Sequence, residues 1–412
     1  MSKSNQPRKP NLKGVGGDPR EQLDDVAEPP GKIWFRDLDE AVIEAERCIQ
    51  CASCVAACPT DSIGIDAEEK RPTLVRMCTG CSRCWDYCPR SGLRYERILD
   101  LFEDERALDD PPIYAARAGD EAASVGQDGG AVTALLSELV EAGDLDGAIV
   151  ATESETEPLR GEAVLATSRE ELLEAAGSVY NQTMGLGQVE DLLEEAGLDP
   201  AEADVALVGT PCVIQGASAL DRYDNPAADP IALTVALMCT RSFEYDRLLS
   251  RLDAFDVDPE AVAKIDVTGG TLYATDADGE VLLETDVDEF DAAGLRGCDE
   301  CADFVGGAAD ISAGNVGTDD DATTVVVRTQ AGLDAWDAAA DALETSEVDR
   351  PETLEKLAGW NQRRAEAIMP REFDPDGTVG ITYDQHREAY DGTDREPEPL
   401  NPARVHQYEE WC

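Results

Sequence analysis

Three short stretches of the sequence are almost entirely apolar or small. They read as strands buried on both faces of a sheet, because a strand covered on both sides has no polar face to alternate with. Around them lie segments in which apolar residues recur every three or four positions, a pattern typical of helices with one buried face. We therefore predict strands at 147–151, 204–210 and 231–237, and helices at 131–143, 169–177 and 243–252.

A second pattern follows further along the chain. Residues 264–285 alternate apolar and polar positions around Asp278-Gly279, which predicts an antiparallel meander with a hairpin turn. Helices are also predicted at 37–46 and 351–368. Because strands and helices alternate from about residue 112 to residue 345, we expect a mixed α/β (or α+β) core.

The charge of the chain changes the picture of its surface. The 412 residues carry a formal net charge of −54, and only seven lysines stand beside 27 arginines. An acidic, lysine-poor surface is typical of a halophilic protein, since high salt screens the self-repulsion. It disfavours nucleic acid as a partner.

The hydropathy pattern also bears on location. The longest apolar run, 231–239, is too short to span a membrane, and residues 1–17 contain no apolar signal segment. We expect a cytoplasmic protein that has no membrane span, although it could sit at the periphery of a membrane complex.

Two runs of cysteines carry the clearest chemistry. Both have the spacing C-x2-C-x2-C-x3-C-P, which is the bacterial-type ferredoxin pattern, where the fourth cysteine of each run binds the other cluster. Zinc prefers paired C-x2-C knuckles, and disulfides are rare in a reducing compartment. We predict two [4Fe–4S] clusters, one on Cys48, Cys51, Cys54 and Cys88, the other on Cys78, Cys81, Cys84 and Cys58.

Four further cysteines are spread more widely along the chain. Cys212 and Cys239 each follow a predicted strand, and Cys298 and Cys301 form another C-x2-C pair. Four thiols suit a third iron–sulfur cluster or a zinc ion, and spacing alone does not choose between them. Cys212 and Cys239 could also be ordinary buried residues. Cys412 is left as a spare thiol.

At this point the chain resembles a known family. Across roughly residues 45–330 it is similar to the β subunit of coenzyme F420-reducing hydrogenase and its dehydrogenase relatives. The fused N-terminal module resembles that of the electron-input subunit of the F420H2 dehydrogenase complex, and plant 7-hydroxymethyl chlorophyll a reductase belongs to the same wider family. The motifs that carry the resemblance are GGAVTALL (129–136), SVYNQT (178–183), VGTPC (208–212), MCTRSFEYDRL (238–248), CDECADF (298–304), ADISAGNVG (309–317) and TTVVVRT (323–329).

The resemblance implies an α/β flavin-binding domain with FAD, coenzyme F420 as the hydride partner, and a third [4Fe–4S] cluster on Cys212, Cys239, Cys298 and Cys301. Gly129 and Gly130 open a predicted helix, whose bare N–H groups could face a pyrophosphate. Gly209 lies at the end of a predicted strand, where ligands usually bind in α/β sheets. No G-x-G-x-x-G fingerprint is present. The expected FAD contacts are Gly129, Gly130, Thr133, Asn181, Gly209, Thr210, Pro211, Gly314, Asn315 and Gly317.

These features divide the chain into four parts. Residues 1–30 are predicted to be a disordered tail, 31–98 the two-cluster ferredoxin module, and 112–345 the FAD-binding domain with the third cluster. Residues 346–412 would form a helical segment and an acidic tail. The module carries ten Lys/Arg against eleven Asp/Glu, so it is nearly neutral in a very acidic chain. We expect it to dock an acidic carrier through arginines such as Arg83 and Arg90, unless those arginines offset cluster charge instead.

The sequence thus predicts an iron–sulfur flavoprotein that couples F420 hydride chemistry to a one-electron carrier, either a ferredoxin or a larger redox complex. Two alternatives remain: a ferredoxin-dependent FAD reductase of an organic substrate, and a non-catalytic electron-relay subunit. Catalytic side chains are not assigned. The two histidines, His386 and His406, lie in the poorly patterned tail.

Overall fold

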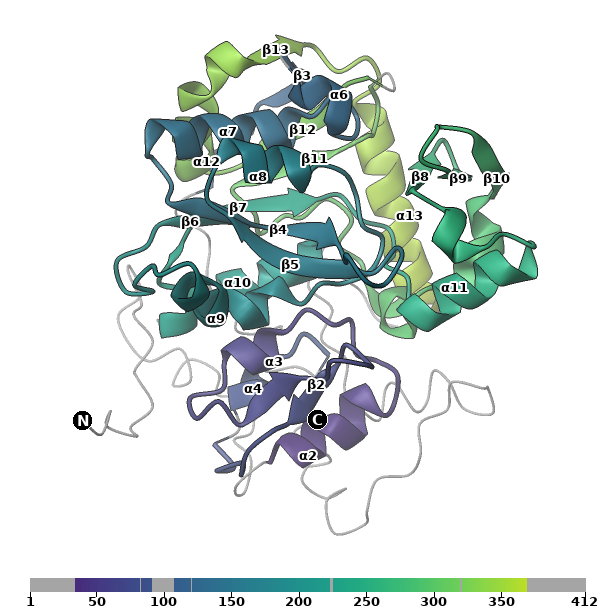
Figure 1. Ribbon diagram of the computed structural model, residues 1–412. Coiled ribbons are helices and arrows are strands. Elements are labelled where there is room, and N and C mark those ends of the chain that lie inside the picture. Colours follow the sequence, from purple (N-terminus) through teal and green to yellow (C-terminus); the bar gives the residue numbers. More distant parts are fainter. Residues whose placement is uncertain are drawn as a thin grey trace.

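A small N-terminal module lies against one side of a larger body built on a twisted sheet (Figure 1). The structure is a computed structural model that describes residues 34–81, 83–90, 107–119, 121–222, 225–318 and 321–368. Within these ranges, no helix is both long enough and apolar enough to cross a bilayer. The predicted N-terminal tail and both histidines lie outside them.

The module is built around its cysteine runs. Cys54 and Cys84 each lie in a one-turn helix, and both belong to an apolar cluster with Phe35 and Leu38. The helix predicted at 37–46 begins two residues earlier and ends in a π-helical segment at Ile43. The elements are α2 (Phe35–Leu38), η1 (Asp39–Ile43), α3 (Ser53–Ala56), α4 (Arg83–Asp86) and the antiparallel pair β1 (Ile63–Ile65) and β2 (Pro72–Leu74).

The body contains an eight-stranded mixed sheet, in the order β13-β3-β12-β11-β7-β6-β4-β5. Strands β11, β7, β6 and β4 are parallel neighbours. Strand β3 is antiparallel to β12, and β12 to β11, so β3 runs in the same direction as these four. The strands are β3 (Ile113–Ala118), β4 (Gly147–Glu153), β5 (Gly161–Ala166), β6 (Val205–Gly209), β7 (Ile231–Leu237), β11 (Ile311–Gly314), β12 (Thr323–Val327) and β13 (Leu343–Ser346).

The three strands predicted from apolar runs are confirmed as the central β4, β6 and β7. In β6, Val205 and Leu207 pack into the core on one face of the sheet, and Ala206 packs into the core on the other. Burial on both faces explains why no polar alternation appears in these strands. Because β3, β4, β6, β7 and β11 point the same way, their carboxyl ends meet at one edge of the sheet, where ligands usually bind in α/β folds.

Helices cover both faces of this sheet (Figure 1). The helices α7 and α12 share one core with the sheet, whereas α9, α10 and the N-terminal module share the other. The predicted helices 131–143 and 351–368 are confirmed, while those at 169–177 and 243–252 are shortened or shifted by two or three residues. The helices are α6 (Ala122–Val125), α7 (Ala131–Ala142), α8 (Arg169–Glu174), α9 (Val189–Glu195), α10 (Pro211–Arg222), α11 (Tyr245–Ala254), α12 (Gln330–Ala338) and α13 (Glu352–Ile368).

The predicted meander forms a separate three-stranded sheet beside α11. Its strands are β8 (Lys264–Thr268), β9 (Thr271–Thr275) and β10 (Val281–Asp286), all antiparallel. Gly279, in the predicted hairpin turn, has a φ of +80°. The remaining helical turns are η2 (Gly185–Gln188), η3 (Pro226–Ala228), η4 (Pro259–Ala261), η5 (Val287–Ala293), η6 (Arg296–Glu300) and η7 (Ala340–Ala342).

The module and the body share one hydrophobic core. Ile49 and Tyr87 of the module belong to the same buried cluster as Leu186 and Ile214 of the body. At the margin, the Arg160 guanidinium donates hydrogen bonds of 2.8 and 2.7 Å to two backbone carbonyls of the module, at residues 67 and 68. The module is therefore fixed in place on the body.

Gly216 marks the closest approach between the two parts. A Cβ built on this α10 residue would collide with the Ser53 side chain at the start of α3. We expect Gly216→Ala to destabilise the iron-loaded protein by about 1–3 kcal/mol, because overpacking outweighs the gain of about 1 kcal/mol in helix propensity. Urea unfolding of the full chain measures this difference.

Gly359 in α13 provides the matched control for this measurement. Its nearest neighbour is the flexible end of Arg363, at 3.1 Å from a built Cβ. Gly359→Ala is therefore expected to stabilise the protein by up to about 1 kcal/mol. If Gly216→Ala raises stability as well, the contact between α10 and α3 is looser than described.

Candidate functional site

Four cysteines from three segments meet beyond the carboxyl edge of the sheet. Cys212 lies in the first turn of α10, directly after β6, and Cys239 follows β7. Cys298 lies in η6, with Cys301 just after it. Burial raises the pKa of the Cys239 thiol to about 12, and the charges of Cys298 and Cys301 add to the rise. Thiols that perturb one another in this way lie close together, so the sheet topology gathers this predicted set.

The first cysteine run of the module closes on the last cysteine of the second run. Burial raises the pKa of the Cys54 thiol, and the charges of Cys88, Cys51, Cys48 and Cys84 raise it further, in that order. Cys88 therefore lies with the first run, as the crossed ferredoxin pattern requires. The contribution from Cys84 brings the second predicted set up beside the first.

The second set reaches the surface of the module. Cys81 is exposed, whereas Cys84 is buried. The Cys78 sulfur accepts backbone N–H bonds from Phe35 and Gly80, at 3.5 and 3.4 Å. Of the three predicted sets, this one contains the only exposed cysteine among the described residues.

The donor chemistry of the three sets fits iron–sulfur clusters. None of the twelve described cysteines forms a disulfide. Backbone N–H groups point at their sulfurs, for example from Gln50 to Cys48 at 3.4 Å and from Ser62 to Cys58 at 3.3 Å. Such bonds favour the thiolate that a cluster needs. Within the described ranges, no three His, Cys, Asp or Glu side chains converge tightly enough for a single metal ion.

Two buried arginines and a glutamate separate the first set from the third. The Arg47 and Arg90 guanidinium groups lie 3.5 and 3.9 Å from the Glu300 carboxylate. Arg90 is only 2% exposed, so it cannot serve the surface docking predicted for it, and that prediction is wrong. Two of the ten positive charges of the module, those of Arg47 and Arg90, are therefore buried and do not contribute to its surface. Arg83, the other arginine predicted to take part in docking, is half-buried.

Gln182 is a hydrogen-bonding residue of the site that the sequence did not predict. Its amide nitrogen donates to Thr210 Oγ1 and to Ser242 Oγ, both at 3.0 Å, and lies 3.7 Å from the Cys212 sulfur. The side chain is buried. The available signal was the SVYNQT motif, in which Gln182 directly follows the predicted contact Asn181.

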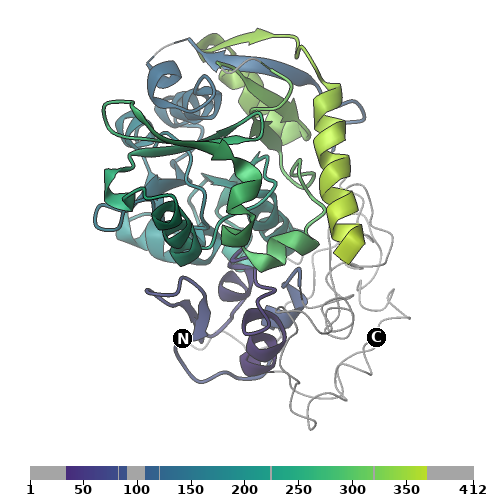
Figure 2. The ribbon, with the colours of Figure 1, turned by 90° about the vertical axis from the view of Figure 1, so that its right-hand side faces the viewer.

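The helix α13 runs along one side of the body (Figure 2), and a residue near its C-terminal end reaches the third set. Arg364 near its C-terminal end donates to the carbonyl oxygens of Thr240 and Cys298, at 2.8 and 3.0 Å. One turn earlier, Asn361 is fully buried, and neither amide atom has a hydrogen-bond partner among the described residues. This helix thus ties together the loops that carry Cys239 and Cys298.

The predicted flavin contacts at the start of α7 lie at the same sheet edge. Gly129 and Gly130 have φ values of +85° and +69°, and a built Cβ on either would collide with backbone of a neighbouring segment. No side chain caps the N-terminus of α7, where Thr133 lies in the first turn. Asn315, after β11, donates to the Asp128 carboxylate at 2.7 Å. The glycines therefore let the loop turn tightly, which leaves the helix end open to an anionic group.

The other predicted contacts divide into two kinds. Gly209 ends β6 and is followed by Thr210 and Pro211, and Gly314 ends β11 and is followed by Asn315 and Gly317, so all of these lie at the carboxyl edge. Asn181 differs, because both of its amide atoms already bond to the protein. Its oxygen accepts from the Gly161 N–H and its nitrogen donates to the Leu159 carbonyl, both at 2.7 Å.

A further buried polar atom lies beside the α7 loop. The Gln127 amide nitrogen donates to the Tyr180 hydroxyl at 3.3 Å and to Asp266 of the meander. The Gln127 amide oxygen is buried and accepts no hydrogen bond from the described residues. An open helix N-terminus and an unused acceptor at one sheet edge fit a polar cofactor such as FAD.

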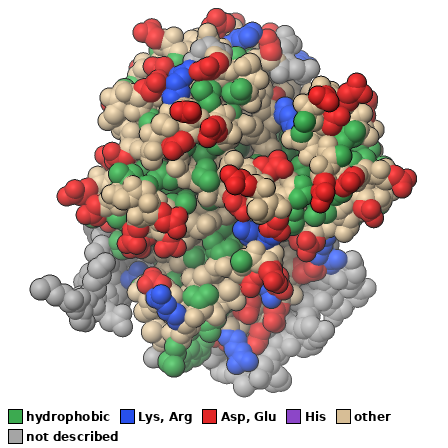
Figure 3. Space-filling view, viewed as in Figure 1, with side chains coloured by type: hydrophobic (Ala, Val, Ile, Leu, Met, Phe, Trp, Pro, Cys, Tyr) green, Lys and Arg blue, Asp and Glu red, His purple; other side chains and the backbone are tan. Residues whose placement is uncertain are grey.

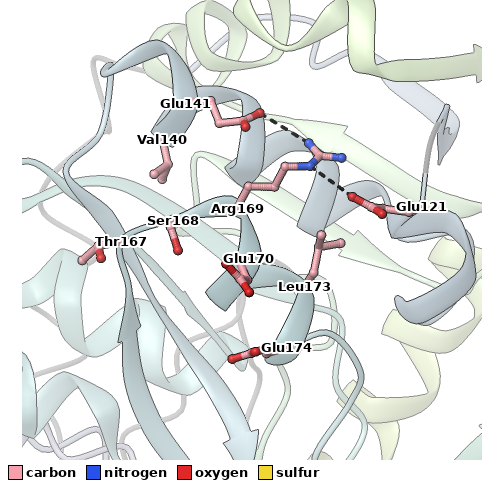
Figure 4. Close-up of a pocket in the computed structure, with 9 residues that line it drawn as sticks. All are labelled: Glu121, Val140, Glu141, Thr167, Ser168, Arg169, Glu170, Leu173 and Glu174. Carbon is pink, nitrogen blue, oxygen red and sulfur yellow. Dashed lines mark ion pairs between the residues drawn. The ribbon is translucent and has the colours of Figure 1, made fainter.

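A surface hollow lies elsewhere. A groove of about 750 Å³ runs between α7 and α8, where Arg169 pairs with Glu121 at 3.6 Å and with Glu141 at 3.5 Å (Figure 4). It contains no cysteine and none of the predicted contacts. We assign it no part in the chemistry.

The fold and the site define a class: an oxidoreductase subunit with an N-terminal iron–sulfur module on a mixed α/β body. Family models identify it further. Residues 41–93 match a 4Fe-4S dicluster domain. Residues 113–190 and 202–351 match the N-terminal and C-terminal models of the coenzyme F420 hydrogenase/dehydrogenase β subunit. The chain belongs to this family of β subunits, which confirms the resemblance seen in the sequence.

Individual relatives agree with this assignment. A chain of the F420-reducing [NiFe] hydrogenase complex from Methanosarcina barkeri superposes with a TM-score of 0.59 at 30% identity, covering 65% of this chain and 94% of that one. A subunit of the F(420)H(2) dehydrogenase of Methanosarcina mazei is 28% identical over 75% of this chain and 87% of its own. The coenzyme F420-dependent sulfite reductase of Methanocaldococcus jannaschii is 32% identical over 80% of this chain, which spans 51% of that protein.

Proposed function

We propose that this chain is an iron–sulfur flavoprotein subunit that passes electrons between coenzyme F420 and a one-electron carrier. The names of the relatives support F420 as the hydride partner. The observation that carries the proposal is the row of thiols. It runs from Cys212 at the carboxyl edge of the sheet, past Cys51, to the exposed Cys81.

FAD is the proposed hydride acceptor, because a flavin can take two electrons together and release them singly. The sheet edge would hold it through the open α7 N-terminus and the loops after β6 and β11. Asn181 is left out, since its amide is engaged with backbone. The proposed contacts are Gly129, Gly130, Thr133, Gly209, Thr210, Pro211, Gly314, Asn315 and Gly317.

Three [4Fe–4S] clusters are proposed on the three sets of thiols. The protein around these thiols does two things. They limit the access of water, since nine of the twelve cysteines belong to shared apolar clusters or pack against them. Its side chains and backbone also hold the ligand loops in place, through Arg364 at the third set and through backbone N–H groups at the first two. Rigid ligand loops keep reorganisation on electron transfer small.

The surface beside the second set supports docking of a carrier there. Met77 is 89% exposed, and Val75 and Leu74 are 56% and 47% exposed. The nearby Arg76 pairs with Asp61 at 3.6 Å, so this patch is close to neutral. Acidic side chains are spread widely over the face of the body that Figure 3 shows. A neutral, apolar patch is the part of the described surface on which an acidic carrier, or a larger redox complex, would meet least repulsion.

Met77→Glu is expected to slow reduction of an acidic ferredoxin by about tenfold, because it adds a repelling charge at the docking patch. Reduction of a small neutral quinone dye should not change. Stopped-flow rates with each acceptor measure the difference. Val281→Glu is the control, because Val281 is also exposed (55%) but lies on the distant β10. If the rate of quinone reduction falls equally, the substitution has damaged the module itself, and docking at this patch is contradicted.

The proposed function is tested by mixing the anaerobic protein with reduced F420 and a one-electron dye. Bleaching of bound FAD followed by rapid dye reduction is the expected result. If FAD is bound but reduced F420 does not bleach it, a ferredoxin-driven reductase of an organic substrate or a relay subunit takes precedence. If the purified protein holds no flavin, the FAD assignment fails.

A further inference from the structure

The buried trio of Arg47, Arg90 and Glu300 lies where no solvent can compensate its charges. The three residues are 1%, 2% and 1% exposed. Two guanidinium groups face one carboxylate, at 3.5 and 3.9 Å. Burying a charge is costly unless partners stabilise it, so one positive charge of this trio requires a further negative neighbour.

The neighbours of the trio are thiols from two different sets. Arg47 directly precedes Cys48, and Arg90 lies two residues after Cys88. Glu300 lies between Cys298 and Cys301 in the body. Arg90 also donates a 3.1 Å hydrogen bond to the carbonyl of Gly297, the residue before Cys298. The Arg90 side chain therefore reaches from the module to the ligand loop of the third set.

The charges that act on the Arg90 guanidinium are consistent with a position next to both sets of thiols. Burial lowers the pKa of its guanidinium, but the negative charges of Cys301, Glu300, Cys298 and Cys212 outweigh burial and raise the pKa overall. On the module side, Arg90 also acts on the thiols of Cys48 and Cys88. Two further arginines lie near the third set: Arg241 binds Asp299 at 2.8 Å, and Arg364 donates to the carbonyl oxygens of Thr240 and Cys298.

We propose that Arg90, held by Glu300 and the Gly297 carbonyl, raises the reduction potentials of the two clusters beside it, so that each is reduced more readily. The inference rests on the proposed clusters. Transfer of one electron would oxidise a cluster held by Cys212, Cys239, Cys298 and Cys301 from a 1+ to a 2+ core and would reduce a cluster held by Cys48, Cys51, Cys54 and Cys88 from 2+ to 1+, with no proton moved. A fixed positive charge stabilises the extra electron on either side.

The sign of the effect provides the test. Arg90→Gln removes a positive charge, so the equilibrium constant for reduction of both clusters should fall about tenfold, which is about 59 mV for a one-electron couple. Glu300→Gln removes a negative charge and should shift both potentials in the opposite direction. The double variant should lie between the two. Redox titration of the full-length iron-loaded protein, followed by electron paramagnetic resonance, measures each potential.

Two further variants separate charge from structure. Arg90→Lys keeps the charge and should restore most of the potential, even if the bond to Gly297 is lost. Arg76→Gln is the matched control, because Arg76 is 67% exposed beside the second set and its charge is screened. Its potentials should stay close to those of the unaltered protein.

Each outcome decides the proposal. Shifts of the same sign in Arg90→Gln and Glu300→Gln, or no shift in either, would overturn it, because structural damage has no sign dependence on charge. If Arg90→Gln does not assemble its clusters, Glu300→Gln and Arg90→Lys still give the signed comparison. If the unaltered protein lacks the third cluster signal, the proposed function fails at that point. The shift in the remaining module cluster then still tests Arg90.

Discussion

Cys298→Ala is expected to lower the iron content from about twelve to about eight atoms per chain, since three sets of four thiols imply three clusters of four irons. The physical reason is the position of Cys298. It is buried in the core shared by module and body, and its thiol acts on that of Cys239. Alanine there leaves three thiols from three separate loops, which cannot hold the cluster against loss of iron. Anaerobic iron and sulfide analysis measures the change.

The same variant should also interrupt electron flow. Loss of a ligand costs at least as much as loss of a residue that only orients a ligand, so carrier reduction should fall by at least about a hundredfold. The two module clusters should keep their signals. Cys412→Ala is the control, because it removes a cysteine that belongs to none of the three sets. Eight irons together with one zinc in the unaltered protein would contradict the third cluster and leave the module assignment intact.

Cys54→Ala and Cys84→Ala are each expected to block electron exit while reduced F420 still bleaches the bound flavin. Cys54 lies in α3 and Cys84 in α4, both in the apolar core of the module. The proposed flavin contacts lie at the sheet edge in the body, outside the module. Removing one module ligand should therefore reduce the rate of ferredoxin reduction by at least about a hundredfold and leave flavin bleaching within a few-fold.

The order of the centres is what these two variants test. Flavin bleaching is followed by absorbance under anaerobic conditions, and ferredoxin reduction is followed separately. Val55→Ala, next to Cys54, is the matched control, since it changes a partly buried apolar neighbour and keeps all ligands. If flavin bleaching is lost together with ferredoxin reduction, electrons do not run from the sheet edge to the module in the proposed order.

Much of the fold could be predicted because its signals are local. The strands at 147–151, 204–210 and 231–237 carry apolar runs that only a doubly covered sheet explains, and they became β4, β6 and β7. The repeated cysteine spacing predicts the module for a similar reason, since one tight loop brings three thiols together. The strands β3, β5, β11, β12 and β13 were missed as strands. They are short or carry polar positions, and their place in the sheet depends on partners far away in the chain.

The candidate site shows the same division. The sequence by itself determined which residues are the candidates for the chemistry, since twelve cysteines, two glycine turns and the family motifs can be read along the chain. Only the tertiary structure decided that Cys212, Cys239 and Cys298 meet at one sheet edge, because parallel strands bring distant carboxyl ends together. It also decided that Arg90 is buried rather than exposed. Charge along a sequence does not tell whether an arginine faces water or a thiol, since burial depends on what packs over it, and here that is η6 of the body.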